Sequence, residues 1–391
     1  MPTSLRLFSS VFLWNFGLGV SHIVVPLYAS HLGFSLVTIG SLFAIPVILQ
    51  FVLGLISGAT TDRWGGRVTL LLACGSPLIG GLIFSVADSL MMMLAGQMAI
   101  SIGRGVFWPA SQAIASVLGG ERSVQMGRLN ASVSTGQITG TAGAGILLAA
   151  TNFTTVFLTF TVLNLLALII CLLLPNFKRQ GEQAKGGLFG AFGPLLKTRR
   201  IYYALLCAYI CAQPVSLGQS FLPLLFEANG FKPDAIGPIL SLRAVGATFS
   251  ALLLARIIGS GRGPVLAALG ACTIGIGLIV TARADSAQAA IIAMTFIGVS
   301  AGLLLLFYQL LVTELSHGGN RGTALAIAGS GWSLSHLTAP FIVGIIAEGV
   351  GLEQAFTIWG VGLFVLGLLM VPLNRWTALA PDPKPDELVA E

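Results

Sequence analysis

Twelve apolar runs, each long enough to cross a lipid bilayer, constrain this sequence more than any other feature. A membrane-spanning helix needs about 20 consecutive apolar residues. Short polar or glycine-containing breaks separate the runs, and one long break lies at 175–200. The predicted spans are 7–29, 37–59, 68–87, 90–118, 126–150, 154–174, 201–226, 234–258, 264–283, 287–313, 322–347 and 354–375. The pattern therefore predicts an all-α membrane protein with twelve transmembrane helices.

The composition excludes a water-soluble fold. Hydrophobic residues make up 55% of the chain and charged residues only 9%, whereas a soluble domain carries about 25% charged residues. The net charge of +6 does not indicate a nucleic-acid partner, because the basic residues are scattered over short loops. The five cysteines lie in apolar runs without the further ligands that a metal site needs. No phosphate-binding loop or nucleophile–base pair is visible, so we expect neither an enzyme nor a cofactor.

Lysine and arginine are distributed unevenly between the two sides of the predicted membrane. If the N-terminus lies inside, sixteen of the 20 basic residues fall on the inward side. Only Lys232 and Arg283 fall outside, while Arg104 and Arg243 lie within helices. Cytoplasmic loops carry an excess of positive charge, so we expect both termini in the cytoplasm. The predicted location is the plasma membrane, which in a bacterium is the inner membrane. There we expect the chain to be a monomer in contact with membrane lipid.

The two halves of the chain repeat each other weakly, which predicts two pseudo-symmetric six-helix bundles. At an offset of about 195, residues 65–67 align with 260–262 and residues 131–136 with 326–331. The basic break between the halves is interpreted as a solvated linker, with a regulatory lid as the alternative. The predicted domains are an N-terminal bundle at 1–174, a cytoplasmic linker at 175–200, a C-terminal bundle at 201–375 and a cytoplasmic tail at 376–391.

The loop after the second predicted helix carries the most specific motif, Gly58-Ala-Thr-Thr-Asp62-Arg63-Trp-Gly65-Gly66-Arg67. It resembles the signature G-x-x-x-D-R-x-G-[basic]-[basic] of the major facilitator superfamily, with a glycine in place of the first closing basic residue. The alternative is an ordinary positive loop. The resemblance implies a solute carrier that works by alternating access. It also implies that this loop gates transport, through Gly58, Asp62, Arg63, Gly65 and Arg67.

Four ionisable side chains fall deep inside predicted spans: Arg104, Arg243, His22 and His336. Such residues are costly in a bilayer and indicate functional sites. In the fold that the resemblance implies, all four stand on helices that line or flank the central cavity. Structural struts or packed histidines are the alternative. Large polar and aromatic residues follow the same helices: Asn15, Tyr28, Gln50, Gln97, Gln112, Gln137, Tyr209, Gln213, Gln219, Tyr308, Gln309 and Trp332. The predicted substrate-binding residues are Arg104, Arg243, His22, His336, Gln112, Gln309, Trp108, Trp332 and Tyr308.

No carboxylate falls in the middle of a predicted span, so the buried arginines leave a positive cavity that suits an anionic or zwitterionic solute. Proton coupling would then use His22, His336, Glu227 or Glu314, and transport without coupling is the alternative. The fifth span has a glycine-rich stretch at 136–145 that resembles an antiporter motif of the family, with simple helix packing as the alternative.

We predict proton-coupled efflux of a small organic solute, as in the drug-efflux branch whose motifs the chain resembles. The first alternative is an organic-anion symporter or facilitator that uses the buried arginines. An alternative of another class is a membrane receptor or lipid-handling protein on a transporter scaffold.

Overall fold

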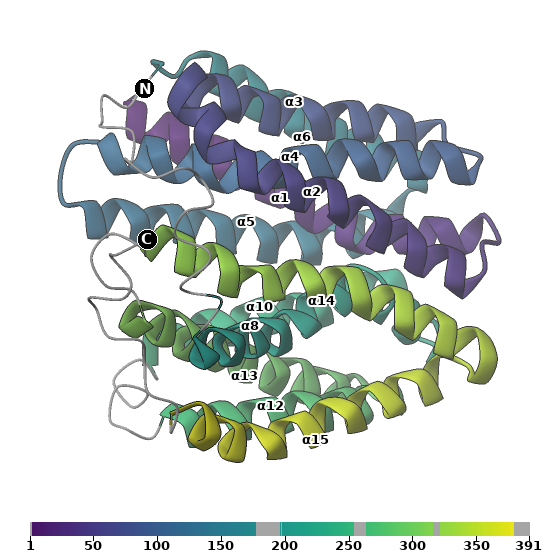
Figure 1. Cartoon of the computed structure of the whole chain (residues 1–391). Helices are drawn as coiled ribbons and strands as arrows, with labels where there is room; N and C mark the ends of the chain where they lie inside the picture. Colours follow the sequence, from purple (N-terminus) through teal and green to yellow (C-terminus); the bar gives the residue numbers. More distant parts are fainter. Residues whose placement is uncertain (1, 177–195, 197, 254–262, 316–320, 379–391) are drawn as a thin grey trace. The chain divides into compact units, whose positions relative to one another are not determined.

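In a computed structural model of the chain, residues 2–176, 196, 198–253, 263–315 and 321–378 are described, and every regular element among them is an α-helix (Figure 1). The helices are α1 (Thr3–His31), α2 (Leu36–Trp64), α3 (Gly66–Ser85), α4 (Leu90–Val117), α5 (Arg122–Ala150), α6 (Phe153–Leu172), α8 (Arg199–Gly218), α9 (Leu222–Ala228), α10 (Pro233–Leu253), α12 (Gly263–Ala282), α13 (Ala287–Leu315), α14 (Arg321–Val350) and α15 (Leu352–Ala378). Each predicted span overlaps one helix, except the seventh, which is divided between α8 and α9.

Local residue chemistry accounts for the ends of several helices. The side chains of Ser35 and Asn152 accept hydrogen bonds at the starts of α2 and α6, as N-cap residues do. Gly65 joins α2 to α3 with φ 92° and ψ 152°, a conformation essentially restricted to glycine. A side chain at Gly65 would also collide with Asn176. The glycine of the loop motif is therefore required by the backbone.

Ten helices in the described part are long and apolar enough to cross a membrane. α5 and α10 are not among these ten. In α5 the stretch 131–145 is rich in Ser, Thr, Gln and Gly, which lowers its hydropathy. By contrast, α6 and α15 expose large apolar side chains such as Leu166, Ile169 and Leu368. Exposed faces of this kind suit contact with lipid.

The chain forms two compact units, and the division between them does not follow the predicted division into two halves on either side of the linker. Unit 1 comprises residues 1–180, 217–244 and 339–351, and unit 2 comprises residues 181–216, 245–338 and 352–391. Unit 1 therefore joins the first six helices to short segments from the second half of the chain. The predicted bundle boundaries stay a prediction, and most of the predicted linker and tail lies outside the described residues.

The interior of unit 1 is built around α1 and α4. α1 packs against α5 and α6, and α4 packs against α2 and α3. The indole of Trp14 stacks on Phe107 with ring centroids 3.8 Å apart, and its Nε1 donates a hydrogen bond to the carbonyl of Ala73 at 2.8 Å. Together these contacts connect α1, α3 and α4 in one apolar cluster.

Glycines allow two close helix crossings in unit 1. A Cβ on Gly237 of α10 would stand 2.6 Å from the carbonyl oxygen of Thr141 in α5. A Cβ on Gly344 of α14 would stand 2.7 Å from the carbonyl oxygen of Leu36 at the start of α2. Only small residues let helix backbones approach so closely. The C-terminal end of α5 therefore meets the N-terminal end of α10, and the start of α2 meets the end of α14.

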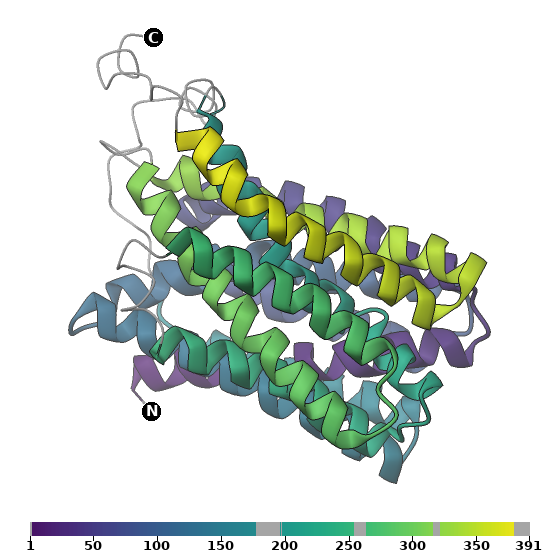
Figure 2. The ribbon, with the colours of Figure 1, turned by 90° about the horizontal axis from the view of Figure 1, so that it is seen from below.

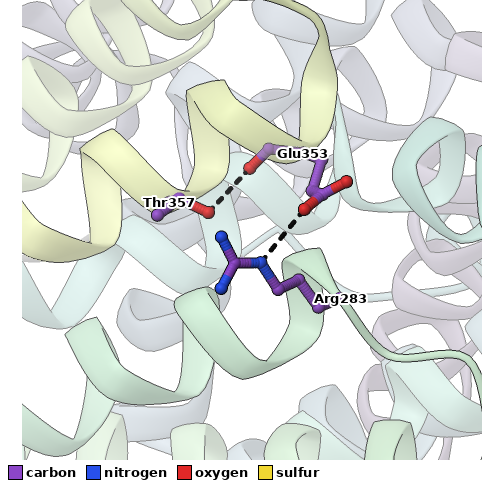
Figure 3. A network of polar contacts seen from close by, with 3 residues as sticks. All are labelled: Arg283, Glu353 and Thr357. Atoms are coloured by element: carbon purple, nitrogen blue, oxygen red, sulfur yellow. Dashed lines mark hydrogen bonds and ion pairs between the residues drawn. The ribbon is translucent and has the colours of Figure 1, made fainter.

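In unit 2, α12 packs along α15 and α13 (Figure 2). The crossing of α12 and α15 again depends on glycine, since a Cβ on Gly360 would stand 2.7 Å from the carbonyl oxygen of Gly275. Arg283, which follows α12, forms an ion pair with Glu353 in the first turn of α15, with its Nε 3.0 Å from Oε1 (Figure 3). Both side chains are exposed, and an exposed pair of this kind contributes about 0–1 kcal/mol.

Candidate functional site

Two arginines from different helices meet the same short break in unit 1. Arg104 of α4 donates a hydrogen bond from Nη1 to Oε1 of Gln219 at 2.9 Å. Arg243 of α10 lies against the preceding residue, because a Cβ on Gly218 would stand 3.7 Å from its Nε. Residues 218 and 219 are adjacent in the chain, so both arginine side chains reach one backbone segment.

That segment is the gap between α8, which ends at Gly218, and α9, which begins at Leu222. Pro214 lies four residues before the end of α8, and Pro223 lies in the first turn of α9. A proline inside a helix removes a backbone donor, whereas one in the first turn is compatible with a helix start. The backbone turns through Phe221, whose N–H donates to the carbonyl of Leu217 at 3.0 Å. The composition of this stretch thus favours an interrupted helix.

The site carries positive charge with no acidic partner in the protein that the structure describes. The one ion pair among these residues joins Arg283 to Glu353 and involves neither site arginine. Gln219, the neutral partner of Arg104, is only 2% exposed, and Ser220 is fully buried. Arg104 and Arg243 themselves are half-buried. A charge in such surroundings is expensive unless a counter-charge or several hydrogen bonds compensate it.

The two predicted histidines lie in different units. His22 is buried in α1, within unit 1. His336 is buried in α14, within unit 2, and its Nδ1 stands 3.0 Å from the carbonyl oxygen of Trp332. Its ring also stacks on that tryptophan, with centroids 5.8 Å apart. Tyr308 of α13 is buried in the same unit, and a Cβ on Gly329 would stand 3.4 Å from its hydroxyl. The structure therefore brings Trp332 and His336 together within unit 2.

The other predicted binding residues are exposed, and in the part of the chain that the structure describes they form no hydrogen bond with either arginine. Trp108 of α4 is 42% exposed and packs edge-on against Phe107. Gln112 of α4 and Gln309 of α13 are exposed as well. These positions stay predictions, since helix placement alone does not join them to the cluster at Gln219.

The predicted gating residues lie at the junction of α2 and α3. Gly65 forms the turn itself, Arg63 is exposed and Arg67 is half-buried. Gly58 and Asp62 lie on α2, but the burial and contacts of these two residues fall outside the described part. The second-half counterpart of the loop, 256–262, also lies outside it.

A cavity of about 550 Å³ opens in unit 1 where α1, α5, α6, α9 and α10 meet. His31 and Glu227 line it, together with Ser30, Asn152 and Phe153. Burial raises the pKa of the Glu227 carboxyl, and the nearby His31 imidazole opposes this rise. His31 also packs its ring against Phe153, with centroids 5.2 Å apart. The cavity thus places an acid from the second half of the chain opposite a histidine from the first.

In the sequence, Gln219 is one of many polar residues on the predicted lining helices, and it was not among the predicted substrate-binding residues. The signal that identifies it is the polar run Gly218-Gln219-Ser220 between two prolines in an otherwise apolar stretch. His31 was not selected because it lies at the end of a span. Among the described residues, no group of three His, Cys, Asp or Glu side chains could hold a metal ion.

Comparisons with known proteins agree with this architecture. The family model described as Major Facilitator Superfamily matches residues 7–317 and 215–390. The chain is 27% identical over 349 residues to the tetracycline resistance protein, class C, of Escherichia coli, an alignment that covers 86% of each chain. It is 24% identical over 363 residues to the uncharacterized MFS-type transporter YfiS of Bacillus subtilis, which covers 88% of this chain and 85% of that protein.

Solved structures with low sequence identity share the fold. A bacterial homolog of the human lysosomal transporter Spinster, in an inward-facing and unoccupied conformation, matches with a TM-score of 0.80 at 16% identity over 98% of both chains. The nucleoside transporter NupG matches with a TM-score of 0.80 at 13% identity, over 96% of this chain and all of that one. The chain thus shares its fold with solved transporter structures despite low sequence identity.

Proposed function

Because this chain belongs to the major facilitator superfamily, we propose that it is a secondary transporter that exports a small organic solute by alternating access, in exchange for protons. Members of the superfamily are transporters and not enzymes. The observation that carries the proposal is the cluster of Arg104, Gln219 and Arg243 at the interrupted helix. Discontinuous helices near the membrane midplane commonly form the solute sites of secondary transporters.

Export is the direction that the relatives favour. The chain aligns over most of its length with a tetracycline resistance protein, and a carrier that confers resistance does so most simply by removing the drug from the cell. Both named relatives are bacterial, which supports the inner membrane of a bacterium as the location. We propose that a single copy of the chain performs transport.

The side chains divide into three roles in this proposal. Arg104 and Arg243 contact the solute, and the other predicted lining residues complete the passage. Buried histidines, His22 and His336, carry protons because imidazole is the side chain whose ordinary pKa lies near neutral pH. The motif residues Gly58, Asp62, Arg63, Gly65 and Arg67 stabilise one access state and release it in each cycle.

The close crossings in unit 1 support alternating access. With the N-terminus inside, the end of α5, the start of α10, the start of α2 and the end of α14 all lie on the outward side. Their close packing would seal that side around the arginine cluster. Transport then requires these ends to separate, which glycine contacts without large interlocking side chains permit.

The test is solute flux in proteoliposomes with and without an imposed proton gradient. The vesicles are loaded with a panel that spans charge types, namely benzoate, tetracycline and tetraphenylphosphonium. We expect at least one compound to move against its own gradient only when protons move the opposite way. Asp62→Asn should slow this movement, whereas Arg128→Gln, on an exposed face of α5, should not.

Two results would contradict the proposal in different ways. If the solute moved only down its own gradient and at a rate independent of the proton gradient, the protein would be a facilitator without proton coupling. No protein-dependent counterflow for any compound would favour the receptor or lipid-handling alternative.

A further inference from the structure

The arginine cluster also identifies the chemical class of the solute. This inference rests on the proposed transport function. It starts from the observation that Arg104 and Arg243, which come from α4 and α10, reach adjacent residues of the α8–α9 break. Two guanidinium groups that lie near one break repel each other unless a negative charge lies between them.

In the part of the chain that the structure describes, no carboxylate provides this negative charge. Neither arginine forms an ion pair with a carboxylate in the part of the chain that the structure describes. The one hydrogen bond of Arg104 goes to the neutral amide of Gln219, and no side chain in the same part accepts one from Arg243. A charge that neither a carboxylate nor several hydrogen bonds compensate is costly inside a membrane, so a negatively charged ligand would stabilise both arginines.

A guanidinium is suited to a particular kind of ligand. Its planar fork of N–H donors matches the paired oxygens of a carboxylate, sulfonate or phosphate group. The bond from Arg104 to Gln219 holds that fork toward the break. Arg243 approaches the same break, since a Cβ on Gly218 would be in ordinary van der Waals contact with its Nε, at 3.7 Å.

We infer that the break between α8 and α9 is an anion-binding site, in which Arg104 and Arg243 clamp the negatively charged group of an organic anion. Gln219 acts as a positioning residue that holds Arg104. The rest of the solute then lies along the apolar walls of the passage. The inference selects an organic anion over the lipophilic cation that a drug exporter without buried arginines would take.

Binding to the full-length purified protein in detergent tests the inference without any transport. Thermal unfolding is followed at constant ionic strength with three probes of similar size: benzoate, phenyl phosphate and benzyltrimethylammonium. We expect saturable stabilisation by at least one anion and none by the cation. Arg104→Gln and Arg243→Gln should each weaken anion binding about tenfold or more, which corresponds to the loss of one charge-assisted contact.

Matched variants separate the site from general effects of charge. Arg128→Gln removes the same charge from an exposed position of α5 and should leave anion binding unchanged. Gln219→Glu places a carboxylate beside Arg104 and should abolish anion binding while the protein stays folded. This variant keeps the test decisive if Arg104→Gln does not fold.

Failure of the anion site and failure of the proposed transport function give different results. Equal stabilisation by benzoate and benzyltrimethylammonium, or equal losses in Arg243→Gln and Arg128→Gln, would overturn the anion site. If the protein supported counterflow of a cation but of no anion, the anion site would also be overturned. The proposal that the protein is a transporter would be upheld. Anion binding that disappears in Gln219→Glu, in a protein that moves no solute, would uphold the site and remove the transport proposal.

Discussion

At the scale of single residues, the pair His31 and Glu227 links the two halves of the chain across a polar cavity. The carboxyl of Glu227 is held on α9, and His31 ends α1. Other charged residues adjoin the lining residues in sequence or contact their neighbours. Lys232 and Asp234 flank the lining residue Pro233, and Asp88 interacts with Tyr28, which follows the lining residue Leu27. Burial and the attraction to His31 act on the carboxyl in opposite directions, and burial is the larger effect.

The raised pKa of Glu227 predicts a pH-dependent stability. A glutamate in the unfolded chain titrates near pH 4.3, so this group favours the folded state below that pH, and the contribution is lost as the pH rises through its raised pKa. Glu227→Gln should therefore melt at a higher temperature than the parent at pH 7 and at the same temperature at pH 4. Thermal unfolding at the two pH values measures the difference.

His31→Gln provides the opposing variant for that measurement. It removes the attraction that offsets burial, so its melting temperature at pH 6 should fall below that of the parent protein. If Glu227→Gln shifted the melting temperature equally at both pH values, titration of this carboxyl would not be the cause.

At the scale of elements, the crossing of α5 and α10 depends on the absence of side chains. A Cβ on Gly145 would meet the carbonyl of Pro233 and stand 2.9 Å from the backbone nitrogen of Gly237. Backbone atoms cannot move aside as a flexible side chain can. We predict that Gly145→Val destabilises the protein by about 1–3 kcal/mol, the usual cost of overpacking, and reduces transport.

Gly127→Val in the same helix is the control for that change. A Cβ there meets nothing within 4 Å, and valine has a slightly better helix propensity than glycine. Its denaturation midpoint should therefore match or exceed that of the parent. Equal losses in the two variants would show that a general effect of valine in α5, and not the crossing, is responsible.

At the scale of the whole molecule, the orientation in the membrane is the prediction with the broadest consequences. The basic residues predict both termini in the cytoplasm. A green fluorescent protein at the C-terminus should fluoresce, and alkaline phosphatase inserted at Gly33 should be active because that turn lies outside. Insertion at Gly119, in the turn between α4 and α5, should give no phosphatase activity. The reverse pattern would contradict this orientation. It would place the crossing of α5 and α10 on the inward side of the membrane instead.

Most of the fold could be predicted from the sequence because hydropathy over about 20 residues is a local property. Every predicted span overlaps a helix, and the motif glycine at Gly65 occupies a backbone conformation that requires it. The break after Gly218 was not predicted, because its three residues include only two polar ones, Gln219 and Ser220, which barely change the mean hydropathy of the apolar run. The candidate site was predicted in its parts, Arg104 and Arg243, but without Gln219, the hydrogen-bond partner of Arg104.

What the sequence by itself determined is the solvent, the number of spans, the family and the presence of deep positive charge. These follow from composition and from spacing along the chain. Only the tertiary structure decided that Arg104 and Arg243, 139 positions apart in sequence, meet the same interrupted helix, and that His31 lines a cavity with Glu227. The reason is physical: contacts between distant segments depend on how helices pack, and packing in lipid is set by close fit between small residues that no local pattern reveals.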